Sequence, residues 1–300
     1  MVFRSTAWRG YALTLLAAFF WAAGGLTAKY LHLEPGVMTA VRSMVAAVVL
    51  GVVLLATKRR AFKLRKPVRD IPFLLLFGVF AQSGMQYTYL QAIAHNKVGV
   101  AILLEYLAPV FTLLLGLVLF RHKPKLMAVV GVTVALIGCA LVVGVANPSG
   151  LTVTPLGLAW GIASAFFFSL YTVVGSRTHG RFSSLTLLFY GMAVSALFWT
   201  FMSGPAAIIA PFMRAETLLP VLLIGSVSTL LPFGAFLMAL RYIPAVNAGI
   251  TAMAEPVLAA IGGAVFFAEA LTPSFILGGL LILAAIAVIQ ISDAWSQESP

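Results

Sequence analysis

The sequence is poor in charge, because only 9% of its 300 residues are Asp, Glu, Lys or Arg, against about 25% in a typical soluble domain. So few charged side chains cannot cover a water-facing surface. Hydrophobic residues make up 62% of the chain, and the mean hydropathy is +1.06. The surroundings must therefore accept apolar side chains, which excludes an ordinary soluble protein and indicates a membrane protein.

Cysteine and histidine are also scarce. Cys139 is the single cysteine, so no intramolecular disulfide can form. The four histidines, His32, His95, His122 and His179, lie far apart near the ends of apolar segments and lack the spacing of a metal site. We expect no metal and no cofactor. Without a histidine in a helix core or paired carboxylates on one helix, we also expect no enzyme.

The net charge of +11 does not indicate a nucleic-acid partner. Its basic residues punctuate apolar segments and do not gather on one helix face or in an aromatic-rich arm. Loop charges that fix the orientation of a membrane protein explain this distribution more simply.

Apolar runs broken by Gly, Pro and charge predict an all-α membrane protein with ten transmembrane helices. Their ranges are 11–31, 36–57, 71–93, 98–120, 125–146, 155–176, 184–203, 217–239, 246–267 and 273–292. The first run is too long for a signal-peptide core, so we expect a mature helix. With the N-terminus in the cytoplasm, fifteen Lys and Arg lie inside and three outside. Both termini are therefore predicted to be cytoplasmic.

The chain also resembles itself at an offset of 147 residues. This shift places Ala18-Phe19-Phe20 on Ala165-Phe166-Phe167, and Gly78 on Gly225. We predict two five-helix repeats, residues 1–147 and 148–300. Because five is odd, the second repeat must be inverted in the membrane. Inverted repeats are typical of secondary transporters, whose binding site lies at the repeat interface.

Several short motifs occur in the order of a known family. They are Trp21 after Ala18-Phe19-Phe20, Pro109-Val110, Glu255-Pro256-Val257-Leu258, Gly262-Gly263, the run from Phe267 to Pro273, and Gly278-Gly279. In these the chain resembles the ten-helix, EamA-type branch of the drug/metabolite transporter superfamily. The resemblance implies a multi-pass carrier of the bacterial inner membrane that exports amino acids or related metabolites. One departure is His122, which stands where the offset places the counterpart of Glu269.

Three charged residues fall at membrane depth, where ionisable groups are expensive and usually functional. Arg42 and Glu105 lie at matched depth, which suggests a pair. Arg42 could hold a substrate carboxylate and Glu105 could take a proton, or the two could form a structural ion pair, with snorkelling of Arg42 as a further alternative. Glu255 precedes Pro256, which frees a backbone carbonyl. It could bind an amine or a proton, or only hydrogen-bond to that backbone.

Proline and glycine mark two further features. Pro109 and Pro256 are repeat equivalents and are expected to kink the fourth and ninth helices around a cavity, unless neighbouring helices simply accommodate them. Gly24 and Gly25 follow Trp21, where they allow either a hinge or close helix packing.

A polar stripe on the third helix predicts a cavity wall. Gln82, Gln86 and Tyr89 are spaced by four and three residues, so they are expected to share one face. The predicted substrate-binding residues are Gln82, Gln86, Tyr89, Arg42, Tyr171, Ser228 and Phe233. Together they suit a zwitterion with a side chain, although interhelical hydrogen bonding is the alternative.

We therefore predict a monomeric secondary transporter that exports amino acids or related small metabolites by alternating access, with protons as a candidate coupling ion. We expect it to lie in the lipid bilayer, in contact with lipid. A proton-coupled multidrug or organic-cation exporter, based on Glu105 or Glu255, is the main alternative. A nucleotide-sugar or organophosphate antiporter ranks lower, because only Arg42 and Lys29 could supply basic groups to the cavity.

Overall fold

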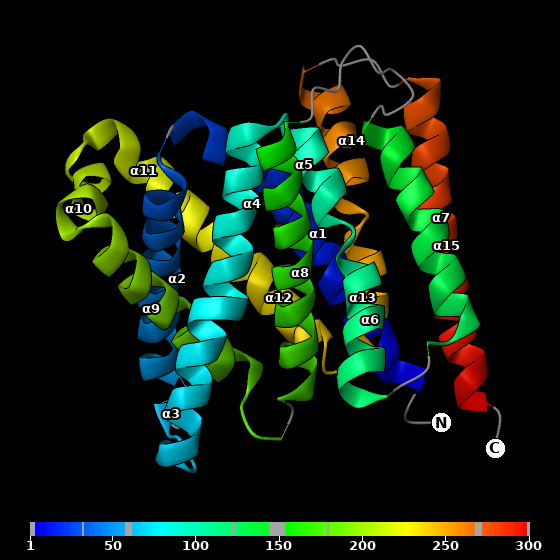
Figure 1. Ribbon diagram of the computed structural model, residues 1–300, viewed down its shortest axis with the longest axis horizontal. Helices are drawn as coiled ribbons and strands as arrows, with labels where there is room; N and C mark the ends of the chain where they lie inside the picture. The colour runs from blue at the N-terminus through cyan, green and yellow to red at the C-terminus, as the bar shows by residue number, and fades with distance from the viewer. Residues whose placement is uncertain are drawn as a thin grey trace.

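A computed structural model describes residues 4–31, 33–57, 62–121, 124–143, 154–178, 180–267 and 272–298, and these form a bundle of helices (Figure 1). The elements are α1 (Arg4–Leu31), α2 (Pro35–Thr57), α3 (Pro67–Leu76), η2 (Phe77–Ser83), α4 (Gly84–His95), α5 (Val98–Glu105), α6 (Ala108–Phe120), α7 (Leu126–Val143), α8 (Pro155–Arg177), α9 (Ser184–Ser203), α10 (Pro205–Met213), α11 (Ala215–Gly225), η4 (Ser226–Leu230), α12 (Leu231–Ala239), α13 (Ala245–Ala252), α14 (Glu255–Phe267) and α15 (Pro273–Glu298). The segments η2 and η4 are π-helical.

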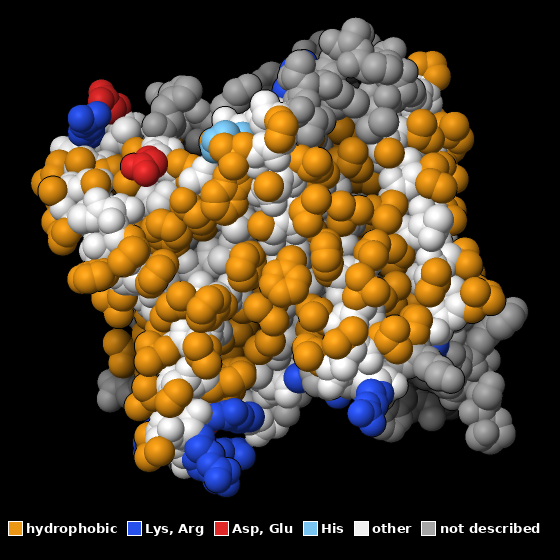
Figure 2. Space-filling view, in the orientation of Figure 1, with side chains coloured by type: hydrophobic (Ala, Val, Ile, Leu, Met, Phe, Trp, Pro, Cys, Tyr) orange, Lys and Arg blue, Asp and Glu red, His pale blue; other side chains and the backbone are white. Residues whose placement is uncertain are grey.

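The outer surface of the bundle is apolar. Large hydrophobic side chains such as Val52, Val118 and Phe201 are more than half exposed, and Figure 2 shows apolar side chains over most of the visible face. Within the described residues, eight helical segments are long and apolar enough to cross a membrane. A surface of this kind is stable in contact with lipid and not with water. The predicted total of ten spanning helices remains a prediction.

Element boundaries repeat at the offset found in the sequence. The helix α5, Val98–Glu105, matches α13, Ala245–Ala252, and α6, Ala108–Phe120, matches α14, Glu255–Phe267, at every bound. In Figure 1, α5 lies above α6, whereas α13 lies below α14. The proposed boundary between residues 147 and 148 lies outside the described residues, so the division of the chain there remains a prediction.

Two helices that the sequence predicts to be continuous are interrupted. The predicted helix 98–120 breaks at Tyr106–Leu107, and 246–267 breaks at the equivalent Met253–Ala254. Pro109 and Pro256 each occupy the second position of the helix after the break. The interruptions thus fall directly before the two prolines, and the kink predicted at Pro109 and Pro256 stays a prediction. Neither proline can donate a hydrogen bond to the carbonyl four residues back, that of Glu105 or Ala252, so the regular helical bonding stops there.

Smaller differences concern the predicted helix 217–239 and the loop before it. The structure divides this helix into α11, η4 and α12, and a short helix, α10, occupies Pro205–Met213. Helix α1 begins at Arg4, seven residues before the predicted start at Tyr11, and it runs unbroken through Gly24 and Gly25. Hydropathy along the sequence does not reveal these interruptions and extra helices, because π-turns and short connecting helices are as apolar as their neighbours.

Close packing between the helices depends on small residues. Helices α7 and α15 lie side by side (Figure 1), and they meet at Gly138 and Gly278. A Cβ atom added at Gly138 would lie 2.6 Å from the carbonyl oxygen of Gly278. Glycine allows backbones to approach this closely, and such packing joins membrane helices where no hydrophobic effect is available.

Candidate functional site

A cavity opens at the end of the bundle where α1 and α4 end. Its wide outer part, of about 260 Å³, begins between Leu33, Pro35, Ala94 and Val98. A narrower part of about 50 Å³ lies deeper, between Met85, Tyr106 and Phe168 and their neighbours. Trp21, Arg42 and Tyr89 line both parts. These three residues therefore join the two parts into one cavity that extends towards the middle of the bundle.

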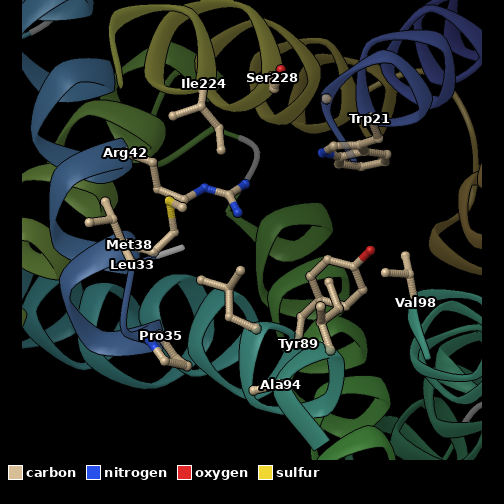
Figure 3. A pocket seen from close by; sticks show the side chains of 13 residues that line it. Trp21, Leu33, Pro35, Met38, Arg42, Tyr89, Ala94, Val98, Ile224 and Ser228 are labelled. Atoms are coloured by element: carbon tan, nitrogen blue, oxygen red, sulfur yellow. The ribbon is translucent and has the colours of Figure 1, made fainter. Parts of the chain in front are cut away.

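Arg42 is the cationic group of this cavity. It lies seven residues below Pro35, so a helical rise of about 1.5 Å per residue places it about 10 Å from the mouth. Its Nε donates a hydrogen bond of 2.9 Å to Oγ1 of Thr229. Its guanidinium also lies 5.8 Å from the ring centre of Phe233. Figure 3 shows the rest of the guanidinium directed into the open cavity, across from Trp21 and Tyr89.

The suggested pair between Arg42 and Glu105 does not form as a direct contact. Glu105 instead accepts a hydrogen bond of 2.8 Å from Ser164 Oγ on α8, and no ion pair between it and Arg42 occurs among the described residues. Both side chains nevertheless line the narrow part of the cavity. Equal depth on two helices does not ensure contact, because each residue is also rotated about its own helix axis.

Glu255 lines the same narrow part and lies beside the break in the second repeat. Pro256 has no N–H, so the carbonyl of Ala252 loses its helical partner. The hydroxyl of Tyr106 lies 2.9 Å from that carbonyl oxygen and 2.8 Å from Oε2 of Glu255. Tyr106, at the break of the first repeat, therefore supplies a hydroxyl group that can hydrogen-bond to the Ala252 carbonyl at the break of the second repeat.

The Tyr106 hydroxyl has a single proton and two acceptor neighbours, so it cannot donate to both. If Glu255 is protonated, it donates to Tyr106, which in turn donates to Ala252, and every group is satisfied. If Glu255 is ionised, Tyr106 donates to the carboxylate and the Ala252 carbonyl loses its partner. The protonation of Glu255 is therefore linked to the hydrogen bonding of the helix break.

An aromatic cluster closes the deep end of the cavity. Trp21 packs edge-on against Phe168 and Phe233, with ring centres 6.0 and 5.3 Å apart. One turn further from the mouth, Phe236 and Tyr171 are fully buried and stack 6.5 Å apart. These five side chains, the aromatic floor, come from α1, α8 and α12. They lie between this cavity and a separate recess of about 570 Å³ at the opposite end of the bundle, lined by Thr112, Val173, Leu240 and Asn247 among others.

The predicted polar stripe of the third helix is divided. Gln86 and Tyr89 line the cavity, but Gln82 does not. The Gln82 side chain is buried towards α9, near Gly191, and its amide atoms have no partner among the described residues. The π-helical segment η2 explains the difference. An extra residue in a turn rotates the preceding residues by about 100° relative to an α-helix, so Gln82 leaves the shared face.

The other predicted residues lie in or near the cavity that Arg42, Glu105 and Glu255 line. Ser228 and Gly24 line the wide part and touch each other, since a Cβ at Gly24 would lie 2.4 Å from Cβ of Ser228. Gly24 therefore permits close packing, and α1 shows no hinge there. The surroundings of Gly25 are outside what the structure describes, as is the motif residue Glu269. Tyr171 belongs to the aromatic floor, and its hydroxyl has no partner in the described part of the chain.

Three contacts that hold the site together were not predicted from the sequence. Thr229 positions Arg42, Ser164 holds Glu105, and Tyr106 bridges Glu255 and Ala252. The sequence gives a weak indication that Tyr106 lies in the site, because it directly follows Glu105 and precedes Pro109 by three residues. It gives no such indication for Ser164, since a hydroxyl residue in an apolar helix most often bonds its own backbone. Thr229 lies with Ser228 and Phe233 in the stripe that is the repeat counterpart of Gln82, Gln86 and Tyr89, but that pattern does not predict its contact with Arg42.

A lipid-facing bundle whose buried cavity is lined by side chains of both charge signs is typical of a membrane transporter. The chain belongs to the EamA-like transporter family, which matches residues 8–144 and 155–291. The two matches start and end 147 residues apart, so the chain contains two EamA repeats. It is an integral membrane protein with a small-molecule substrate.

Relatives agree with this assignment over most of the chain. An uncharacterized inner membrane transporter, YicL of Salmonella typhimurium, is 26% identical over 298 residues, covering 95% of this chain and 96% of the relative. The threonine/homoserine exporter RhtA of Escherichia coli is 27% identical over 238 residues, covering 79% and 77%. A protein of known crystal structure has the same fold, with a TM-score of 0.75 at 20% identity and coverage of 94% and 96%.

Proposed function

We propose that the protein exports small amino acids or closely related zwitterions across the bacterial inner membrane by alternating access. The observation that supports this best is the charge of the cavity. Arg42 faces the same space as Glu105 and Glu255, and a zwitterion needs one cation for its carboxylate and one carboxylate for its amine. The similarity to the threonine/homoserine exporter supports the same substrate class.

In this proposal Arg42 binds the substrate carboxylate through the guanidinium nitrogens that Thr229 leaves available. The amine lies towards Glu105 or Glu255. Gln86, Tyr89 and Ser228 supply hydrogen bonds around the backbone of the substrate. Its side chain lies against the faces of Trp21 and Phe233, and the size of that space limits which amino acids fit.

The proposed cycle uses ten helices as two inverted halves, with both termini in the cytoplasm. The opposite directions of α5–α6 and α13–α14 in Figure 1 support the inversion. The excess of basic residues at the end opposite the cavity mouth supports the orientation. In that orientation the cavity is open to the outside, and the aromatic floor is the barrier that must open towards the cytoplasm.

We further propose that protons drive the cycle through Glu255, and that Glu105 assists. The two carboxylates line one narrow cavity of about 50 Å³, where carrying both charges at once is unfavourable. Uptake of a proton by Glu255 completes the hydrogen bonds at the helix break through Tyr106. Loss of that proton leaves the Ala252 carbonyl unpaired and favours rearrangement of α13 and α14.

Binding of labelled threonine to purified protein in detergent tests the substrate class. We expect Arg42→Gln to weaken binding about 10- to 100-fold, because a hydrogen bond to a charged group contributes about 1.5–3 kcal/mol. Arg214→Gln, an exposed change at the same end, is the control and should bind as the wild type does. Equal binding by the wild type and Arg42→Gln would show that Arg42 does not bind the substrate.

A second candidate is an organic-cation exporter. Two carboxylates and several aromatic faces in one cavity also suit a lipophilic cation. The two functions differ in their need for Arg42, which a cation without a carboxylate does not use. Binding of an organic cation that is unchanged or improved in Arg42→Gln, without binding of threonine by the wild type, would favour this candidate.

A further inference from the structure

A second cavity lies at the opposite end of the bundle from the mouth of the transport cavity. It has a volume of about 430 Å³ and is lined by Arg65, Lys66, Arg69, Asp70 and Arg181, with Gly180. Arg65 and Lys66 directly precede α3, Arg69 and Asp70 lie in its first turn, and Arg181 lies in the connection between α8 and α9. Residues more than a hundred positions apart thus form one strongly basic recess.

The single acidic residue of this recess is already neutralised. Asp70 is buried and accepts hydrogen bonds of 2.9 Å from Arg181 Nε and 2.9 Å from the backbone N–H of Lys66. Arg181 Nη2 lies 2.8 Å from the same carboxylate. The Arg181 guanidinium is also fixed over the ring of Phe73, 4.8 Å from its centre. The exposed side chains of Arg65, Lys66 and Arg69 therefore give the recess a net positive charge.

The recess borders directly on the lipid-facing surface. The candidate membrane span Pro67–His95 begins beside it. Along the first turns of this span, Val68 is 89% exposed, and Ile71 and Leu75 are about half exposed. Figure 2 shows basic side chains gathered at the lower end of the molecule, where α3 begins, beneath a continuous apolar surface. The recess therefore lies at the level of the lipid headgroups.

We propose that this recess binds the phosphate headgroup of an anionic phospholipid such as phosphatidylglycerol. Arg65, Lys66 and Arg69 bind the phosphate oxygens, and the acyl chains lie along Val68, Ile71 and Leu75. A soluble phosphate compound would use only the basic groups, whereas a phospholipid uses both the charge and the apolar strip. Basic recesses between membrane helices bind lipid headgroups in this way. This site does not depend on the proposed transport function.

Native mass spectrometry of the purified protein with phosphatidylglycerol tests the proposal. We expect the variant Arg65→Gln/Arg69→Gln to bind the lipid at least tenfold more weakly than the wild type. The control Lys63→Gln/Arg241→Gln changes the net charge equally, and its residues lie outside the recess. Size-exclusion chromatography reports whether each variant stays folded. Equal affinity in the recess variant, or an equal loss in the control, overturns the proposal.

A competition experiment distinguishes the two sources of phosphate. Inorganic phosphate at millimolar concentration should displace little phosphatidylglycerol, because it lacks acyl chains, and phosphatidylcholine should bind poorly because its headgroup is neutral overall. Displacement of phosphatidylglycerol by inorganic phosphate would show a site for free phosphate and would overturn the lipid assignment. Equal retention of phosphatidylcholine would show that the recess does not select for charge.

Discussion

Arg42 depends on one hydroxyl group for its position. Thr229 Oγ1 accepts the Nε hydrogen bond of Arg42 and itself donates, at 2.7 Å, to the carbonyl of Ile224, five residues back in the π-helical turn. The cation of the site therefore depends on an unusual backbone geometry on a different helix. Sequence reasoning identified Arg42 from its depth in an apolar helix. It assigned the wrong neighbour, because contacts between residues 187 positions apart leave no trace in periodicity.

Replacing Thr229 tests this positioning. Thr229→Val keeps the shape but removes the hydroxyl, so we expect the affinity for threonine to fall about tenfold, as the loss of about 1–1.5 kcal/mol predicts. Thr229→Ser keeps the hydroxyl and should bind within about twofold of the wild type. Equilibrium binding of labelled threonine measures both. Wild-type affinity in Thr229→Val would contradict the positioning role of the hydroxyl.

Tyr106 and Glu255 provide the test of proton coupling. Glu255→Gln cannot ionise, so we expect exchange that no longer depends on pH across the range where the wild type responds. Tyr106→Phe keeps the carboxyl group but leaves the Ala252 carbonyl unpaired, which should cost about 1 kcal/mol of stability. Its pH dependence should be shifted but not abolished. Unchanged pH dependence in Glu255→Gln would exclude Glu255 as the proton carrier.

At the scale of helices, the interruptions occur in pairs. The breaks at Tyr106–Leu107 and Met253–Ala254 are repeat equivalents, and so are η2 and η4, within a residue or two. The two breaks and η4 lie beside the cavity, whereas no residue of η2 lines it. The sequence predicted the helices and the repeat, because both depend on apolar runs and on Gly and Pro positions. It did not predict the breaks, since the prolines that mark them are also compatible with a kinked, continuous helix.

The contact of α1 with η4 sets the width of the cavity. Because Gly24 leaves no space for a Cβ beside Ser228, we expect Gly24→Ala to push the two elements apart and to lower the melting temperature and the exchange rate. Gly262→Ala is the matched control, since a Cβ there meets nothing within 4 Å. Thermal unfolding and exchange in proteoliposomes measure the effect. An equal response of the two variants would contradict this packing account.

At the scale of the whole molecule, the proposed orientation has a direct consequence. The start of α1 and the end of α15 lie at the same end of the bundle as the basic recess (Figure 1). We expect a fluorescent reporter fused after Pro300 to be active in the cytoplasm, and an alkaline phosphatase fused there to be inactive. The reverse result would mean that the cavity opens to the cytoplasm, which would exclude the proposed outward-open state.

The family, its two repeats and the membrane location follow from the composition and pattern of the chain, because these depend on sums over many residues. Which side chains line the cavity depends on how each helix is rotated about its axis. The π-helical segments and the helix breaks change that rotation. The predicted residues Arg42, Glu105, Glu255, Gln86 and Tyr89 line the cavity, whereas the contacts made by Thr229, Ser164 and Tyr106 were, for that reason, not predicted.

Transport by reconstituted protein tests the central claim most directly. Proteoliposomes loaded with unlabelled threonine are supplied with labelled threonine, a labelled sugar phosphate or a labelled organic cation. The account predicts that only the amino acid accumulates, that an inward proton gradient changes its rate, and that Arg42→Gln abolishes the accumulation. Accumulation of the cation alone, independent of Arg42, would contradict the account.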